Sequence, residues 1–161
     1  MKKLAMAVAF TVITCLSNIS MAAADNTNQV IIKNGTQNSI KGSETIFNGN
    51  ARIDMLFTQL DDRAISGAYV TFDPGVRSSW HTHPKGQILV VTAGSGLTQE
   101  WGKPIQEINP GDIIWCPPGV KHWHGAKPNT AMTHLSFCEA VDGSNVNWLE
   151  KVSDKQYKGE E

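Results

Sequence analysis

The pattern of hydrophobic and polar positions from residue 51 onward is a series of short apolar runs separated by turn residues. Three of the turns are Asp73-Pro74-Gly75, Asn109-Pro110-Gly111 and Pro117-Pro118-Gly119, in which proline presets φ and glycine allows a positive φ. Short strands with such turns between them are typical of an all-β sandwich or barrel. We predict strands at residues 52–58, 66–72, 79–83, 87–93, 96–99, 105–108, 112–116, 122–126 and 130–138.

The N-terminal pattern is different, because residues 1–24 have the organisation of a secretory signal peptide. Lys2 and Lys3 precede an apolar stretch at residues 4–16, and Ala22-Ala23-Ala24 offers the small residues of a cleavage site. An uncleaved membrane anchor is the alternative, but a spanning helix needs about 20 apolar residues. We therefore predict an exported, periplasmic protein that has no membrane segment once the signal peptide is removed.

The rest of the chain divides into a polar arm at residues 25–49, with a short strand at residues 30–32, and one domain at residues 50–161. Residues 146–157 resemble a terminal amphipathic helix, with Trp148, Leu149 and Val152 on one side. With 18% charged residues and a net charge of −1, the chain has no basic run that would indicate a nucleic-acid partner.

Two cysteines would remain in the exported protein, Cys116 and Cys138. An oxidising compartment permits a disulfide between them. A soft metal ligand and a reactive thiol are the functional alternatives, and we favour two small buried residues in strands.

Five histidines lie between residues 81 and 134, all in predicted strands. Side chains two apart on a strand share a face, so His81 with His83, and His122 with His124, can each aim two rings at one point. Imidazole is the commonest metal ligand in proteins, so the pattern predicts a metal site. The fifth, His134, shares its face with Ser136 and Cys138.

Trp80 and Trp123 fall on the faces opposite the histidines next to them. We therefore expect these two side chains to pack against another sheet or another subunit rather than to bind substrate.

The spacing of these residues resembles the two signature motifs of the cupin superfamily. Gly75 is followed after five residues by His81-x-His83, then by Gln87 and Gly94, and Gly111 is followed after five residues by Pro117-x-Gly119 and then His122. The resemblance implies an all-β cupin barrel, which is a double-stranded, jelly-roll-like β-helix, here with a short C-terminal helix. It also implies a homodimer or a higher homo-oligomer.

Two positions depart from the cupin motifs, with Gln87 where glutamate is usual and Ala126 where asparagine is usual. Gln87 keeps a carbonyl oxygen that can bind a metal, although as an alternative it is an ordinary polar strand residue. Three neutral imidazoles and a neutral amide would leave a divalent ion its full charge. Nitrogen and oxygen donors favour manganese or iron, with zinc, nickel and cobalt as alternatives.

A narrower resemblance is to the small bacterial manganese cupins with hydroxynitrile lyase activity. It rests on these segments: Arg52-Ile53-Asp54, Trp80-His81-Thr82-His83-Pro84, Gly86-Gln87, Val91-Thr92-Ala93-Gly94, Lys121-His122-Trp123-His124-Gly125-Ala126 and Thr130-Ala131-Met132-Thr133-His134-Leu135. It implies that the metal ligands are His81, His83, Gln87 and His122, and that His124 and His134 line the pocket without binding the metal. The pocket glutamine of that family is Cys138 here.

Three functions follow as hypotheses. The leading one is a lyase that cleaves or forms cyanohydrins, a small-molecule substrate, with the metal as Lewis acid and His124 or His134 as general base. The second is an iron or manganese dioxygenase or decarboxylase, and the third is a non-catalytic periplasmic cupin that binds a metal or small ligand. In all three, His124 and His134 could instead orient the true ligands.

Overall fold

The computed structural model describes residues 29–57 and 64–160, so the predicted signal peptide lies outside the described residues. The elements are β1 (Ser39–Lys41), β2 (Ala51–Phe57), β3 (Ile65–Phe72), β4 (His81–Thr82), β5 (Gln87–Gly94), β6 (Gly96–Glu100), β7 (Gln106–Ile108), β8 (Ile113–Cys116), β9 (His122–Ala126), β10 (Met132–Glu139), β11 (Asn147–Trp148) and α1 (Asp154–Lys158).

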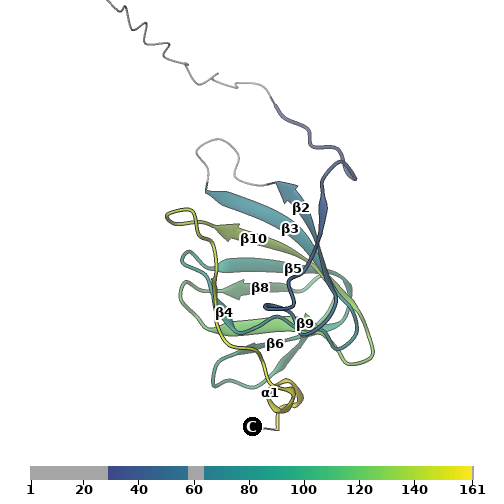
Figure 1. Cartoon of the computed structure of the whole chain (residues 1–161), viewed down its shortest axis with the longest axis vertical. Helices are drawn as coiled ribbons and strands as arrows, with labels where there is room; N and C mark the ends of the chain where they lie inside the picture. Colours follow the sequence, from purple (N-terminus) through teal and green to yellow (C-terminus); the bar gives the residue numbers. More distant parts are fainter. Residues whose placement is uncertain (1–28, 58–63, 161) are drawn as a thin grey trace, which may run out of the picture. The chain divides into compact units, whose positions relative to one another are not determined.

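The strands form two antiparallel sheets. The six-stranded sheet has the order β1-β2-β3-β10-β5-β8, and its strands from β2 to β8 are stacked in that order in Figure 1. The five-stranded sheet has the order β11-β4-β9-β6-β7. The jumps from β3 to β10 and from β4 to β9 bring segments from the two halves of the domain side by side, as a jelly roll requires.

Apolar side chains fill one end of the space between the sheets. The cluster includes Phe47, Phe72, Val91 and Met132, each no more than 6% exposed. Buried histidines pack against this apolar cluster, and Phe72 contacts the rings of both His124 and His134. The apolar core is therefore in direct contact with two of the buried histidines.

The strand predictions of the sequence are confirmed, each within two residues at its ends, where the residues are described. Thr58 lies outside the described residues. Two strands were not predicted, β1 and β11, and the strand expected at residues 30–32 is wrong, since those residues are exposed coil. Because β1 pairs with β2, part of the predicted arm belongs to the six-stranded sheet.

The helix predicted at residues 146–157 is wrong in its extent. Asn147 and Trp148 pair with β4, and the amide of Leu149 donates to the carbonyl of Trp80, so their backbone groups are used by the sheet. The helix begins after Ser153, whose side chain accepts a hydrogen bond from the amide of Gln156 in a capping box.

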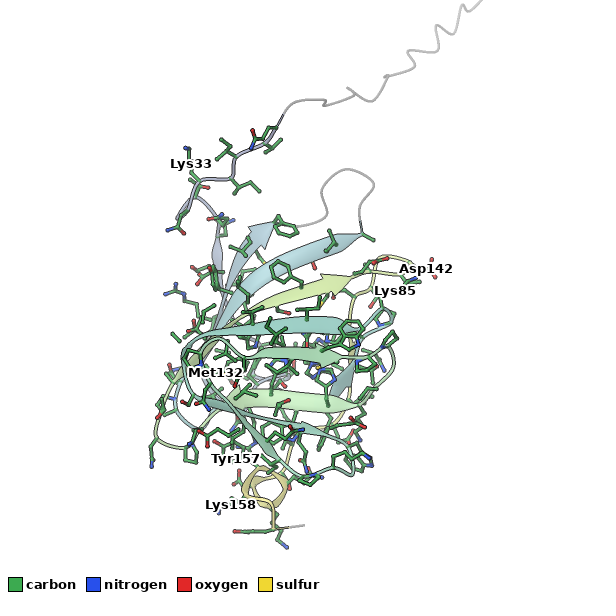
Figure 2. The ribbon with its side chains drawn as sticks, turned by 180° about the vertical axis from the view of Figure 1, so that it is seen from behind. Lys33, Lys85, Met132, Asp142, Tyr157 and Lys158 are labelled. Carbon is green, nitrogen blue, oxygen red and sulfur yellow. The ribbon has the colours of Figure 1, made fainter. Side chains whose placement is uncertain are left out.

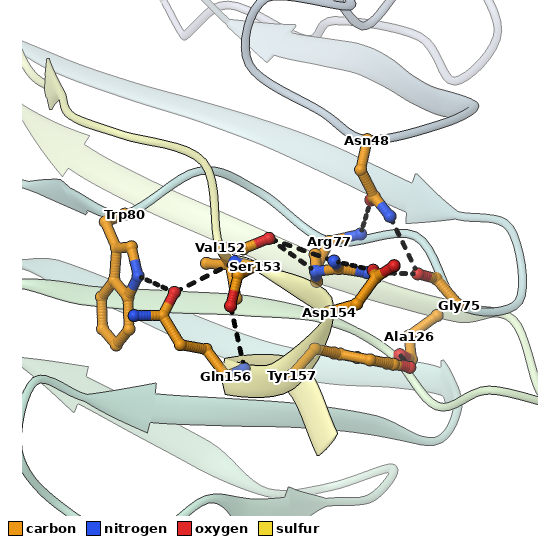
Figure 3. Close-up of polar contacts among 10 residues, drawn as sticks. All are labelled: Asn48, Gly75, Arg77, Trp80, Ala126, Val152, Ser153, Asp154, Gln156 and Tyr157. Atoms are coloured by element: carbon orange, nitrogen blue, oxygen red, sulfur yellow. Dashed lines mark hydrogen bonds and ion pairs between the residues drawn. The ribbon is translucent and has the colours of Figure 1, made fainter. Parts of the chain in front are cut away.

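The C-terminal segment is fixed to the barrel by a set of contacts that we call the C-terminal clamp (Figure 3). The guanidinium of Arg77 is buried and donates to the carbonyl of Val152 at 3.0 Å and to Asp154 at 2.6 Å. The same guanidinium lies 4.5 Å from the ring centre of Tyr157, whose hydroxyl donates to the carbonyl of Ala126 at 2.7 Å.

The clamp also covers the outer face of the five-stranded sheet. Trp80 and Trp123 are 2% and 0% exposed and pack with Val152 and Tyr157. In Figure 2, Tyr157 lies between α1 and the strands, whereas Lys158 points away from them. The expectation that these tryptophans pack against another sheet or another subunit was therefore wrong, because the C-terminal segment of their own chain covers them.

Within the described ranges, no helix has both the length and the apolar character that crossing a membrane requires.

The clamp predicts a clear difference between two substitutions. Arg77→Met should lower the unfolding free energy by about 1.5–3 kcal/mol, because it removes a charged donor from a buried carbonyl. Asp154→Asn should have a much smaller effect, because that carboxylate is exposed and its ion pair is screened by water. Urea denaturation followed by tryptophan fluorescence measures both, and equal losses would contradict this account of the clamp.

Candidate metal centre

The centre of the site is a row of side chains across the five-stranded sheet. His81 on β4 pairs directly with His122 on β9, and residues that face each other in an antiparallel pair point to the same side. His83 follows β4 and shares that side with His81. The three rings are buried, and their ligating nitrogens all lie within 4.8 Å of one another.

Backbone carbonyls fix the proton on each of these rings. The Nδ1 atoms of His81, His83 and His122 lie 2.9, 2.6 and 2.9 Å from the carbonyl oxygens of Ser79, Asn145 and Val120. A carbonyl can accept but not donate, so each Nδ1 carries the hydrogen and each Nε2 presents a lone pair.

These lone pairs suit a cation. Among the described residues, the Nε2 atoms of His81 and His83 are buried and have no hydrogen-bond partner. An unpaired buried acceptor is unfavourable, whereas three convergent imidazole nitrogens are a typical donor set for a divalent metal. The triad could therefore hold such an ion.

Gln87 approaches the triad from the facing sheet. Its amide nitrogen donates to Ser136 Oγ at 3.0 Å and lies 3.6 Å from Cys138 Sγ, which turns its Oε1 to within 3.1 Å of His122 Nε2. Because the hydrogen of His122 is on Nδ1, two lone pairs face each other across this short distance. A shared cation would make that arrangement favourable, so Gln87 fits the place of a fourth ligand.

The backbone before Gln87 requires a glycine. Gly86 has φ 83°, and a Cβ there would lie 2.7 Å from the carbonyl oxygen of Cys116. This left-handed turn is inaccessible to most side chains, and it directs β5 into the sheet with Gln87 facing inward.

The other two histidines form a pair beside the triad. His134 Nε2 lies 3.1 Å from His124 Nδ1, and the remaining ring nitrogen of each is buried without a partner in the described part of the chain. His124 is also close to the triad, with its ring centre 5.2 Å from that of His81. The structure thus brings all six residues predicted for the site together.

Burial keeps the histidines neutral. It lowers the pKa of His122 and of His134 from 6.5 to about 4, and it lowers the pKa of His81 and of His124 well below 6.5. Burial also lowers the pKa of His83. Neutral imidazole is the form that binds metals or accepts a proton, so at pH 7 the rings are in the form that either role requires.

A cavity of about 190 Å³ opens beside these rings, and most of its lining is apolar. The polar part includes His81, His83, Gln87, His124 and His134. The apolar part includes Ile53, Met55, Ala68, Val70 and Trp148. A small organic molecule could therefore place a polar group against the histidines and an apolar group against the opposite wall.

The two cysteines flank Gln87 in the sheet. Cys116 and Cys138 each pair with Gln87, on β8 and β10, which places their Cα atoms about 9–10 Å apart, beyond the reach of a disulfide. Both are free and buried, as the favoured interpretation of the sequence expected. Burial raises the pKa of Cys116 to about 12, which argues against a reactive thiol there.

Two contributors to the site were missed in the sequence. Asn145 acts through its backbone carbonyl, so its side-chain type carried no indication of the role. Trp148 was assigned to a helix, although it lies over the ring of His81 with 4.8 Å between ring centres. The alternation of polar and apolar residues at 145–148 was the one available indication of a strand.

The two-sheet barrel and its histidine triad define a cupin, and a family model described as a cupin domain matches residues 68–138. The chain belongs to the cupin family. It is 54% identical over 124 residues to an (R)-mandelonitrile lyase from Granulicella tundricola, an alignment that covers 77% of this chain and 95% of that protein.

Solved structures agree on the fold. A cupin-like protein from Thermotoga maritima is 37% identical, with a TM-score of 0.70 over 81% of this chain and 96% of that chain. A predicted oxalate decarboxylase from the same organism is 19% identical, with a TM-score of 0.62 over 70% of this chain and 100% of that chain, and it supports the fold alone.

The buried histidines predict a pH-dependent stability for the protein treated with a chelator. Above pH 6.5, both the folded and the unfolded chains leave these rings neutral. Between pH 6.5 and about 4, the unfolded chain binds protons that folded His122 and His134 do not bind, so stability falls as the pH falls. Each ring contributes up to about 1.4 kcal/mol per pH unit.

Urea unfolding at pH 7.5 and pH 5.0 in the presence of a chelator measures this loss. His134→Asn should reduce the loss of unfolding free energy between these two pH values by the contribution of one histidine. A stability that does not change between these pH values would contradict the burial of neutral rings.

Proposed function

We propose that this cupin is a metal-dependent lyase that cleaves or forms cyanohydrins, with manganese as the ion. The observation that carries the proposal is the 54% identity to an (R)-mandelonitrile lyase along almost the whole of that protein, in a chain whose histidine triad could hold a metal. The apolar cavity beside the triad supports the same activity, because it has room for a small organic substrate.

The proposed ligands are His81, His83 and His122 through Nε2 and Gln87 through Oε1. All four are neutral, so they would not reduce the positive charge of the ion. Manganese suits this mixture of nitrogen and oxygen donors, and iron, zinc, nickel or cobalt would use the same atoms. A bound ion supplies Lewis acidity that stabilises negative charge on the substrate oxygen.

The proposed base is His134, which faces the cavity and is neutral at pH 7. It accepts the proton of the cyanohydrin hydroxyl, the bond to the nitrile carbon breaks with its electron pair leaving as cyanide, and an aldehyde or ketone remains. The hydrogen bond between His134 Nε2 and His124 Nδ1 stabilises the positive charge that His134 acquires. The same proton then passes to cyanide, so the release of hydrogen cyanide returns the pair to its neutral state.

A non-catalytic metal-binding cupin is the second candidate, and one observation favours it. Cys138 stands where the resembling lyases have a pocket glutamine, so the cavity lacks an amide at this position. The dioxygenase or decarboxylase hypothesis rests on fold likeness alone. Measuring cyanide release from mandelonitrile by the metal-loaded protein separates the lyase from the other two hypotheses.

We also propose that the protein is exported to the periplasm and assembles as a homo-oligomer. Export is supported by the pattern of residues 1–24. The outer face of β5 and β8 supports assembly, because Ile88, Ile113 and Trp115 are 42%, 72% and 55% exposed there.

Gln87→Glu tests the proposed fourth ligand. The added negative charge should hold the metal at least as tightly while making it a weaker Lewis acid, so lyase turnover should fall with metal content unchanged. Elemental analysis and a cyanide assay provide the two readouts. Gln99→Glu is the matched control, because that amide lies on the other face of its sheet and bonds to Trp123 and Lys103. Unchanged turnover and unchanged metal in Gln87→Glu would mean that Gln87 is a bystander.

His134→Ala tests the proposed base. The variant should retain its metal and lose about 10²–10⁴-fold in turnover of mandelonitrile, the usual contribution of a general base. Thr133→Ala, on the opposite face of β10, should retain its rate. Loss of metal in His134→Ala would make His134 a ligand or an essential support of one, and full metal with full rate would refute this mechanism. Because His124 is hydrogen-bonded to His134, the double variant need not show the product of the single effects.

A further inference from the structure

A strand pairing of two residues places a tryptophan beside the candidate metal centre. Trp148 on β11 pairs with His81 on β4, which pairs with His122 on β9. The three side chains therefore form one row on the inner side of the five-stranded sheet. Of these three residues, Trp148 is neither a predicted metal ligand nor the predicted base.

Trp148 forms the outer wall of the cavity. Its indole lines the cavity and lies over His81, with 4.8 Å between ring centres. It also makes an edge-to-face contact with Phe47, with 6.3 Å between ring centres. The residue is 38% exposed, so one part of it faces solvent while another part faces the cavity. A molecule bound beside His81 would contact this ring.

The wall is attached firmly at both ends. On one side, the carbonyl of Asn145 accepts the hydrogen bond from His83 at 2.6 Å. On the other side, the amide of Trp80 donates to the carbonyl of Glu150 at 2.9 Å, and Lys151 donates to the carbonyls of Glu44 and Phe47 at 2.6 and 2.8 Å. Because the C-terminal clamp follows directly, the backbone that carries Trp148 cannot leave the barrel without breaking several of these bonds.

An indole at the wall of a cavity of about 190 Å³ limits what the cavity can hold. The polar histidines would take the hydroxyl or carbonyl end of a substrate, and its organic group must then lie among apolar residues. Since the indole is among the largest of these side chains, its removal enlarges the cavity more than most single substitutions at the wall would.

We propose that Trp148 is a specificity-determining residue that packs against the organic group of the substrate and sets the largest group accepted. This inference rests on the proposed cyanohydrin lyase activity for its substrate class. The indole offers a flat face for an aryl group, and it excludes a fused two-ring group that would need the space the indole occupies.

The test compares Trp148→Ala, Trp148→Phe and the wild type on mandelonitrile and on the cyanohydrin of 2-naphthaldehyde. Trp148→Ala should raise the ratio of kcat/KM for the naphthyl over the phenyl substrate by at least about tenfold, in the range of pocket size effects. Trp148→Phe should lie between the two. Trp115→Ala is the matched control, because that exposed indole lies on the outer side of β8, and it should not change the ratio. Metal content should be equal in all four proteins.

A binding measurement keeps this inference separate from the lyase proposal. Calorimetry with benzaldehyde and 2-naphthaldehyde on the metal-loaded proteins should show the same change in preference in Trp148→Ala. If the wild type releases no cyanide but the preference changes, the lyase proposal fails and the role of Trp148 stands. An unchanged preference with metal retained, an equal change in Trp115→Ala, or no aldehyde binding by Trp148→Ala would each overturn the role of Trp148.

Discussion

Three hydrogen bonds from imidazole Nδ1 atoms to backbone carbonyls are the constraint on which the whole site depends. They place the hydrogens of His81, His83 and His122 on the outside of the cluster and leave three lone pairs converging on one point. Burial lowers the pKa values of these rings, so protonation at neutral pH does not remove the lone pairs. Together, these two effects produce a buried group of acceptors that could hold a cation.

The fold supplies each of these carbonyls from a different segment. Two come from residues just before the histidines they hold, and the third comes from Asn145, whose side-chain amide donates to Ser66 Oγ at 3.0 Å. The facing sheet then brings Gln87 and His134 to the same cavity, where His134 meets His124 of β9. The barrel therefore separates two regions, because neutral donors collect at one point while the proposed base and an apolar wall lie beside it.

Much of this could be predicted from sequence, for physical reasons. The spacing of His81, His83 and His122 indicates the triad because strand alternation is local, and turns with proline and glycine mark the strand ends. The edge strands β1 and β11 escaped prediction because they are two or three residues long and depend on backbone pairing with distant partners. The position of Trp148 in the cavity wall escaped for the same reason, since the short amphipathic segment around it fits a helix as well as a strand until its pairing partner is known.

The crystal structure of the manganese-loaded protein, with anomalous scattering recorded at the manganese edge, tests the central claim most directly. The account predicts one ion per chain, bonded to Nε2 of His81, His83 and His122 and to Oε1 of Gln87, with every Nδ1 still directed at its carbonyl. An ion bound through an Nδ1 atom, an ion elsewhere on the chain, or a Gln87 amide nitrogen facing the ion would contradict it.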